Sequence, residues 1–503
     1  MIRPRHILAF LLTVLFLIAA LAWVFPDDGV KIGSVELKFP GLKEFFNPEK
    51  VEYADISDIV KKQLEVDTSD VSIVDTTSTQ DTVRADAEVL EASEYPIEYA
   101  GNARQDMYDF FARMEQNSGT KPLRIMHYGD SQIEADHISG FLRERLQQSF
   151  GGHGVGYLAV KPVTQKLSWR VHPGEAWQRY TLYGKVDSSI THKQYGPAMA
   201  LFRYAPVWND TISGDTIAND TILWDSTEYK ASFTVENSFQ GYGRTNRWDK
   251  AKLFYGNLHK PVVLSLYGEE DELIRQDSLM PTENTREYLL SDSLMKTFRV
   301  EMSGYDSPDV YAISLESNEG VILDNMPLRG SAGTVFTAME YGMMLDWLNR
   351  MNAGMLIVQF GVNVVSDEID DFTYYQTWMT RQLQALQRMR PDMPVLMVGI
   401  SDMSKKEGTK YVSYNAIEKI RDAQKNAATE AGVAFWDMYE AMGGENSMPS
   451  WVWADPPLAN KDFTHFNVEG ARIISNMLYN AIMLEYHNYR NQKAEANEAG
   501  EGV

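Results

Sequence analysis

The sequence predicts an α/β fold that carries a large β-rich insertion and an apolar N-terminal segment. Strand and helix patterns alternate after residue 321, and one further strand–turn–helix unit precedes residue 150. Such alternation predicts a parallel sheet with helices on both faces. Residues 156–320 instead hold short alternating runs separated by turn-forming segments, which predict an inserted domain of the β-sandwich type. With 503 residues, 44% of them hydrophobic, the chain can bury a sizeable core.

The N-terminus predicts a membrane segment. Two arginines precede an apolar run over residues 7–25, and two aspartates follow it. The run is long enough to span a bilayer as a helix, and its basic flank predicts a cytoplasmic N-terminus. Residues 20–22 also resemble a signal-peptidase site, so a cleaved signal peptide and a secreted product are the alternative. We favour a retained anchor because the apolar run continues to Phe25. Both interpretations place the bulk of the chain outside the cytoplasm, on the periplasmic side of the envelope.

The composition excludes several kinds of partner and chemistry. The formal net charge of −23 opposes binding to nucleic acid. The absence of cysteine excludes disulfides, thiolate metal sites and a cysteine nucleophile. A His-Glu-x-x-His metal motif and a Gly-x-Ser-x-Gly elbow are also missing. We therefore expect no metal and no cofactor, and the oligomeric state stays open.

Changes in composition along the chain divide it into five parts. The expected parts are an anchor or signal (1–26), an acidic Ser/Thr-rich spacer (27–95), a discontinuous α/β domain (96–155 and 321–487), the β insertion (156–320), and a polar tail that frays (488–503).

Periodicity places the elements of the α/β domain. Apolar residues at helical spacing, such as Met107, Phe110 and Phe111, define one face of each helix, and short apolar runs define the strands. The expected strands are 123–128, 321–325, 355–360, 395–400 and 433–436, and the expected helices are 103–116, 133–150, 335–351, 373–390, 415–431 and 468–486.

The first candidate site is the sequence His-Tyr-Gly-Asp-Ser-Gln at residues 127–132, which follows a strand. Gly129 permits a tight turn, and Ser131 would begin the next helix, where backbone N–H groups point outward. A serine in that position can attack a carbonyl carbon, and its own N–H can stabilise the resulting oxyanion. The competing interpretation is that Ser131 only caps the helix.

Two further segments follow strands and could supply oxyanion donors. Residues 329–334 read Arg-Gly-Ser-Ala-Gly-Thr, and glycine there could bring a backbone N–H close to a substrate. Residues 359–363 read Gln-Phe-Gly-Val-Asn, and the Asn363 amide could donate to an oxyanion. Either segment could also be an ordinary turn.

The fourth segment, Asp462-Phe-Thr-His465, precedes the last helix. A separation of three residues places both side chains on one side of a helical turn. Asp462 could then hold one imidazole nitrogen of His465 and leave the other free as a base.

Together these four segments resemble the conserved blocks of the SGNH hydrolases, also called the GDSL esterase and lipase family. The name-giving residues would be Ser131, Gly333, Asn363 and His465, and their order and placement after strands match the family. The resemblance covers the α/β part of the chain and does not extend to residues 156–320.

The resemblance implies a flavodoxin-like three-layer α/β/α fold. It also implies that Ser131 is the nucleophile, His465 the base and Asp462 its orienting acid. The oxyanion hole would consist of the amides of Ser131 and Gly333 and the side chain of Asn363.

The sequence departs from the family pattern at two positions. Gln132 replaces the usual leucine, and Val364 replaces a common acidic residue, which indicates a divergent branch. Gly330 competes with Gly333 for the glycine position, and we choose Gly333 because it is followed by Thr and an apolar helix start. More loosely, the insertion and the export segment resemble the peptidoglycan O-acetylesterases and the alginate-acetylation proteins.

These observations predict a serine-dependent ester hydrolase, with a carbohydrate O-acetylesterase of envelope or extracellular polysaccharide as the leading hypothesis. The expected partners are an acylated carbohydrate and, through the N-terminal helix, the membrane. An O-acetyltransferase using the same acyl-enzyme and a non-catalytic polysaccharide-binding assembly protein are the alternatives. The tryptophans of the insertion, at positions 169, 177, 208, 224 and 248, could stack on sugars, but a place in the core is the favoured interpretation. Trp451 and Trp453 could wall the active-site pocket.

Overall fold

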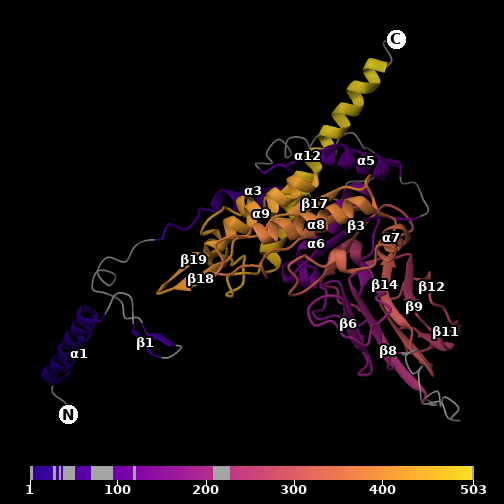
Figure 1. Ribbon diagram of the computed structural model, residues 1–503, viewed down its shortest axis with the longest axis horizontal. Coiled ribbons are helices and arrows are strands. Elements are labelled where there is room, and N and C mark those ends of the chain that lie inside the picture. The colour runs from indigo at the N-terminus through magenta and orange to yellow at the C-terminus, as the bar shows by residue number, and fades with distance from the viewer. Residues whose placement is uncertain are drawn as a thin grey trace.

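The computed structural model describes residues 4–25, 30–32, 35–37, 51–69, 95–116, 121–207 and 227–500 (Figure 1). Its α/β part is built on a parallel sheet with strand order β15-β3-β16-β17-β20. The strands are β3 (Leu123–Gly129), β15 (Val321–Pro327), β16 (Ala353–Gln359), β17 (Val395–Val398) and β20 (Ala434–Trp436). Numbered along the chain, this order is 2-1-3-4-5, as in flavodoxin. The predicted fold class is confirmed.

Helices cover both faces of this sheet and make three layers. The helices are α5 (Ala103–Gln116), α6 (His137–Phe150), α7 (Tyr341–Arg350), α8 (Thr373–Met389), α9 (Ala416–Ala431), α10 (Met438–Ala441), α11 (Ser447–Trp453) and α12 (Val468–Gly500), with short 3₁₀ turns η1 (Ser131–Asp136) and η3 (Phe336–Ala338). Met126 and Tyr128 of β3 belong to the hydrophobic cluster of α7, α8 and α9. Ile125, the residue before Met126, belongs to the cluster of α5, α6 and α12 on the other face. Alternate residues of a strand thus enter different layers.

The insertion consists of two antiparallel sheets. One has the order β11-β10-β13-β8-β5 and the other the order β12-β9-β14-β7-β6, with β4 beside β14. The strands are β4 (Gly156–Leu158), β5 (Trp169–Pro173), β6 (Gln178–Thr181), β7 (Ala200–Arg203), β8 (Tyr229–Asn237), β9 (Lys250–Gly256), β10 (Val262–Tyr267), β11 (Leu273–Leu279), β12 (Arg286–Ser291), β13 (Thr297–Gly304) and β14 (Asp309–Glu316), and η2 is Gly243–Asn246. One hydrophobic cluster joins side chains from both sheets, as a sandwich requires.

Aromatic residues of the insertion fill this core. Trp169, Trp177 and Trp248 are each at most 2% exposed, so they do not offer a face to a sugar. Trp208 and Trp224 lie outside the described residues. The favoured interpretation of core packing therefore holds for the three tryptophans that the structure describes.

The insertion shares its packing with the α/β part. Tyr128 of β3 donates its hydroxyl to the carbonyl of Pro197 at 2.9 Å. Trp347 of α7 donates its indole N–H to the carbonyl of Tyr195, also at 2.9 Å, and its ring contacts Tyr311 of β14 with 5.5 Å between centroids. The two parts are therefore joined by buried contacts and not only by the chain.

Three expected helix boundaries are wrong by several residues. The helix expected over 335–351 begins only at Tyr341, after the short turn η3. The helix expected over 133–150 begins only at His137, because the backbone of Glu134 and Ala135 is not helical. Ala135 has a positive φ of 57°. The tail expected to fray from residue 488 continues α12 to Gly500. Tyr489 packs against α5, and Lys493 binds Glu115 of α5 at 2.6 Å, so tertiary contacts hold the helix beyond the expected end.

The N-terminal region contains α1 (Pro4–Val24), a hairpin of β1 (Val30–Ile32) and β2 (Val35–Leu37), and α3 (Ser57–Ser69). Helix α1 is long and apolar enough to cross a membrane, a test that a signal sequence also passes. Residues 51–63 are docked on the α/β part, with Ile56 only 7% exposed. These docked residues lie within the segment 27–95, which composition assigned to a spacer.

Candidate active site

The turn after β3 presents Ser131 at the carboxyl edge of the parallel sheet. Gly129 is needed there, because a Cβ atom would lie 2.8 Å from the Gln359 carbonyl oxygen. Asp130 is buried, and its carboxylate accepts hydrogen bonds from the N–H groups of Gln132 (3.0 Å) and Gly361 (3.1 Å). Asp130, and not Ser131, is thus the residue that caps η1. The Ser131 hydroxyl is left available for a different partner.

That partner is His465. The Oγ atom of Ser131 lies 2.8 Å from Nε2 of His465, and Nδ1 of His465 lies 2.8 Å from Oδ2 of Asp462. The structure therefore brings together a hydroxyl, an imidazole and a carboxylate from opposite ends of the α/β part. With Nδ1–H donated to the carboxylate, Nε2 can accept the serine proton, which is the arrangement that activates a serine nucleophile.

Backbone hydrogen bonds within the Asp462–His465 loop hold the Asp462 carboxylate in place. Oδ1 of Asp462 accepts the backbone N–H groups of Thr464 (3.0 Å) and His465 (3.1 Å). Partial burial acts to raise the pKa of Asp462, but the hydrogen bonds from the His465 backbone and ring and from Thr464 outweigh it, so that the pKa is below its ordinary value. Asp462 consequently stays ionised when the imidazole takes up a proton.

Gln132 contributes a contact that the sequence did not reveal. Its side-chain amide donates to the carbonyl of Thr464 at 2.6 Å and to the hydroxyl of Ser401 at 2.9 Å. Gln132 is 7% exposed, and it joins the nucleophile turn directly to the residue before His465. In the sequence it was visible only as a departure from the leucine of the family pattern.

The loop of residues 329–334 has one position that requires glycine for packing. Gly333 has φ +78°, and a Cβ there would lie 2.7 Å from the ring of Phe360. Gly330 has φ +79°, but a Cβ there would have no atom within 4 Å. The close approach to Phe360, which precedes the Gly361–Asn363 turn, favours Gly333 as the residue of this loop that belongs to the site.

Gly333 and Asn363 converge on Ser331. The Gly333 N–H donates to the Ser331 hydroxyl, and the Asn363 side-chain amide donates to the Ser331 carbonyl, both at 3.1 Å. The two candidate oxyanion donors therefore lie together, although each has a partner within the loop. Binding of an oxyanion requires that Gly333 exchange its contact, whereas the Asn363 amide carries a second hydrogen.

A buried polar network lies beneath the nucleophile turn. His127 contacts the Ser139 hydroxyl through Nδ1 at 2.9 Å and the Gln359 side-chain oxygen through Nε2 at 3.1 Å. Burial lowers the pKa of His127 to about 4. Burial likewise raises the pKa of Asp130 to about 6, although hydrogen bonds from Gln132 and Gly361 and the charge of His465 oppose it.

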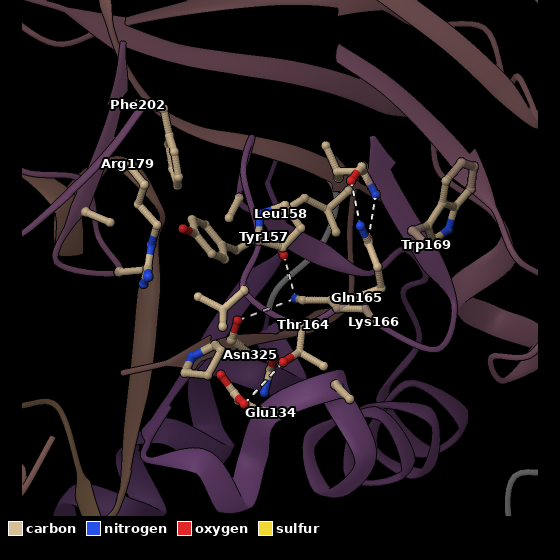
Figure 2. A pocket seen from close by; sticks show the side chains of 18 residues that line it. Glu134, Tyr157, Leu158, Thr164, Gln165, Lys166, Trp169, Arg179, Phe202 and Asn325 are labelled. Carbon is tan, nitrogen blue, oxygen red and sulfur yellow. Dashed lines mark hydrogen bonds between the residues drawn. The ribbon is translucent and has the colours of Figure 1, made fainter. Parts of the chain in front are cut away.

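A small cavity adjoins the site between the α/β part and the insertion (Figure 2). Lys166 extends into it and donates to the Tyr157 carbonyl at 2.6 Å, and Glu134, from the nucleophile turn, accepts from Thr164 at 3.2 Å. The cavity holds about 50 Å³, room for a few waters but not for a sugar ring. Its lining does not include Ser131 or His465, so it is a neighbour of the candidate site and not part of it.

Within the described residues, no group of three or more His, Cys, Asp or Glu side chains could hold a metal ion. The candidate chemistry uses the side chains and backbone groups described above.

Comparison with known proteins matches residues 292–473 to the model of the GDSL-like lipase/acylhydrolase family. The segment 292–473 therefore belongs to the SGNH/GDSL hydrolase family, as the sequence predicted. The segment matched to this family contains Gly333, Asn363, Asp462 and His465, and Ser131 lies outside it. This match confirms the predicted enzyme class, an SGNH-type ester hydrolase. No curated protein sequence matches the chain significantly.

A solved structure supports the same fold over most of this chain. A peptidoglycan O-acetylesterase is 19% identical, covers 78% of this chain and 99% of its own, and superposes with a TM-score of 0.59. An acetyl xylan esterase, AlAXEase, is 16% identical over 32% of this chain and 81% of its own, with a TM-score of 0.25. A family two carbohydrate esterase from Cellvibrio japonicus is 10% identical over 52% of this chain and 92% of its own, with a TM-score of 0.21. At this identity, the first likeness establishes a shared fold that extends over most of both chains.

Proposed function

We propose that the protein removes O-acetyl groups from a polysaccharide of the cell envelope, with Ser131, His465 and Asp462 as its catalytic residues. The observation that carries this proposal is the chain of two 2.8 Å contacts from the serine hydroxyl through the imidazole to the carboxylate. A non-catalytic binding protein would have no need of this alignment, so the alignment counts against that alternative.

The first half of the proposed reaction forms an acetyl-enzyme. Ser131 Oγ attacks the ester carbonyl carbon while its proton passes to Nε2 of His465. The bond between that carbon and the sugar oxygen then breaks, and the imidazolium returns the proton to the departing sugar hydroxyl. Asp462 stabilises the imidazolium between these two transfers.

The negative oxygen of the tetrahedral intermediate needs donors. We assign this role to the Ser131 and Gly333 backbone N–H groups and to the side-chain amide of Asn363. The approach of Gly333 and Asn363 to a common point at Ser331 supports the assignment.

The second half of the reaction consumes water. Water attacks the acetyl carbon and gives a proton to His465, the bond to Ser131 Oγ breaks, and the serine regains its proton as acetic acid leaves and ionises. The side chain of His465 is 33% exposed, so water can reach the base. The exposed base is therefore open to water, as hydrolysis requires.

An acetylated glycan outside the cytoplasm fits two observations. The fold extends over 99% of a peptidoglycan O-acetylesterase, including a β-rich region beyond the α/β part. The apolar helix α1 fits an anchor or an export signal. We propose that α1 stays in the membrane and keeps the catalytic part on its outer side.

The test is acetate release from a panel of substrates. Wild type should release acetate from at least one of O-acetylated peptidoglycan, acetylated alginate and acetylated xylan, and Ser131→Ala should lose about 10⁴-fold or more of that rate. A phosphonate that reacts with activated serines should label wild type at Ser131 and leave Ser131→Ala unlabelled. Near-normal acetate release by Ser131→Ala would overturn the nucleophile assignment. Added sugar acceptors that capture the acetyl group in preference to water would favour the transferase.

A further inference from the structure

Four aromatic side chains form a cluster beside the candidate catalytic loop. Trp453, at the end of α11, has its ring centroid 5.1 Å from Tyr53, 5.8 Å from Tyr411 and 5.6 Å from Phe463, each at an interplanar angle of 76–79°. Tyr411 and Phe463 are themselves stacked, with 3.7 Å between centroids and an angle of 9°. We refer to these four residues as the aromatic cluster.

The aromatic cluster is attached to the residues proposed to carry the chemistry. Phe463 lies between Asp462 and His465, and its backbone has a positive φ of 55°. Tyr411 belongs to the hairpin of β18 (Ser404–Glu407) and β19 (Lys410–Ser413). The N–H of Ser404 in this hairpin donates to the Phe463 carbonyl at 3.0 Å. The hairpin and the cluster therefore support the loop that positions the base.

Within the cluster, Trp453 is held firmly but is not covered. Its side chain is 52% exposed, whereas Trp451, two residues earlier, is fully buried. Edge-to-face contacts with three rings fix an indole in one orientation. A fixed and exposed indole next to a reaction centre offers a flat apolar surface, and little conformational entropy is lost when a ligand covers it.

We propose that Trp453 is a stacking subsite for a pyranose ring of the acetylated glycan, one or more sugars away from the sugar that carries the acetyl group. The inference rests on the proposed function and names a binding residue for it. The apolar C–H face of a pyranose can cover an indole, and this contact needs no charge, which suits a chain with a net charge of −23. The cavity of about 50 Å³ beside the site is too small for a sugar ring, so it is not the subsite.

The test compares a polymer with a small ester. For Trp453→Ala in the full chain, KM for O-acetylated peptidoglycan or acetylated xylan, whichever wild type uses, should rise roughly tenfold. The ratio of kcat/KM on that glycan to kcat/KM on 4-nitrophenyl acetate should fall by a similar factor. Trp453→Phe should recover part of the loss, because a smaller ring still stacks. Short acetylated oligosaccharides should show less of the effect than long ones.

Trp378→Ala is the matched control. Trp378 is 49% exposed on α8 and contacts Tyr374, away from the aromatic cluster. Its replacement should leave the ratio of the two substrates at the wild-type value. A fall in that ratio equal to the one in Trp453→Ala would show a general effect of losing a surface tryptophan and would overturn the proposal.

Two other outcomes overturn the proposal without touching the proposed function, and a third overturns both. Equal losses on glycan and on 4-nitrophenyl acetate would show that Trp453 only supports the catalytic loop. An unchanged KM for glycan together with weaker binding to anionic lipid vesicles would make Trp453 a membrane contact. If wild type released acetate from no glycan but cleaved 4-nitrophenyl acetate, the proposed glycan substrate would fail, and the stacking subsite with it.

Discussion

At the scale of single residues, Gln132 ties the nucleophile to the base. Its amide donates to the Thr464 carbonyl at 2.6 Å, one residue before His465. Gln132→Leu has a similar volume but no donor, so the His465 loop should lose its link to the nucleophile turn. We expect kcat to fall roughly tenfold to a hundredfold with little change in KM, because the loss of alignment affects the transition state most. Steady-state kinetics, with thermal unfolding as a check on folding, measures this; a wild-type kcat would show that the link has no functional role.

The contribution of the Asp462 charge can be tested without replacing His465. Asp462→Asn keeps a side chain that can hydrogen-bond but removes the negative charge and can hold the wrong imidazole tautomer. We expect kcat to fall by up to about 10⁴-fold with folding unchanged. Because the pKa of Asp462 is already below its ordinary value, this carboxyl should not set the loss of wild-type activity on the acid side. A kcat/KM profile against pH decides the matter, and a profile identical to that of wild type would reduce the triad to a Ser131–His465 pair.

Two buried groups beneath the turn should oppose each other in the pH dependence of stability. The pKa of His127 falls from 6.5 to about 4, so the folded state binds fewer protons than the unfolded state and stability rises with pH across that window. The pKa of Asp130 rises from 3.8 to about 6, so the folded state binds more protons and stability falls with rising pH. Each effect amounts to about 3 kcal/mol and they nearly cancel.

Single replacements should therefore reveal opposite slopes. His127→Gln should remove the rise in unfolding free energy that His127 causes between about pH 4 and 6.5. Asp130→Asn should remove the fall in unfolding free energy that Asp130 causes between about pH 4 and 6. Urea unfolding of wild type and both variants at several pH values measures these differences. Profiles that stay parallel to wild type would show that neither group titrates in the folded state as its burial implies.

At the scale of elements, a buried arginine joins the insertion to the parallel sheet. Arg124 of β3 binds Asp324 of β15 at 2.6 Å and Ser314 of β14 at 2.7 Å, and it also pairs with Glu316. Arg124→Met would leave two buried carboxylates without their arginine partner and should lower the free energy of unfolding by about 3–5 kcal/mol. The double variant Arg124→Met with Asp324→Asn should recover part of the loss. Chemical denaturation measures both, and a loss below about 1 kcal/mol would mean that the network is not a significant link.

The contacts between these elements also indicate what removal of the insertion would do. The sequence marked residues 156–320 as a β domain because its strands alternate, and the two sheets agree with that pattern. Alternation does not show which outer positions face another domain. Tyr311 of β14 packs on Trp347 of α7, and Tyr128 of β3 binds the Pro197 carbonyl. Excision of the insertion would therefore expose Trp347 and Tyr128.

Element boundaries were harder to predict than element types. The helix after Ser131 is interrupted at Ala135, which has a positive φ although it is not glycine, and composition alone does not signal such a break. The last helix is longer than predicted because Tyr489 and Lys493 contact α5, which lies nearly four hundred residues earlier. Both misses come from tertiary contacts that override local preference.

At the scale of the whole molecule, local order in the sequence was enough to find the candidate site but not its supports. Ser131, Asn363 and the Asp462–His465 pair each follow a recognisable strand or precede a helix, and the sheet order places these ends at one edge. Their catalytic roles stay predictions. The contact of Gln132 with Thr464 spans 332 positions and has no local signature. The same holds for the docking of residues 51–63, which composition had assigned to a solvated spacer.

That docked segment makes the last prediction, which concerns the N-terminal region as a whole. Ile56 is buried, the Ala54 carbonyl accepts the Ser450 hydroxyl at 2.7 Å, and Gln63 binds Asn476 of α12 at 2.7 Å. A chain beginning at residue 51 should therefore keep the stability of the α/β part. A chain beginning at residue 95 should lose about 2 kcal/mol of unfolding free energy. This is the net of the gain from burying one isoleucine and forming two hydrogen bonds and the cost of ordering the segment. Ile56→Ala in the longer chain should reproduce much of the loss. Urea unfolding of the three proteins measures this, and equal stability of the two truncated chains would show that the segment rests on the surface without stabilising it.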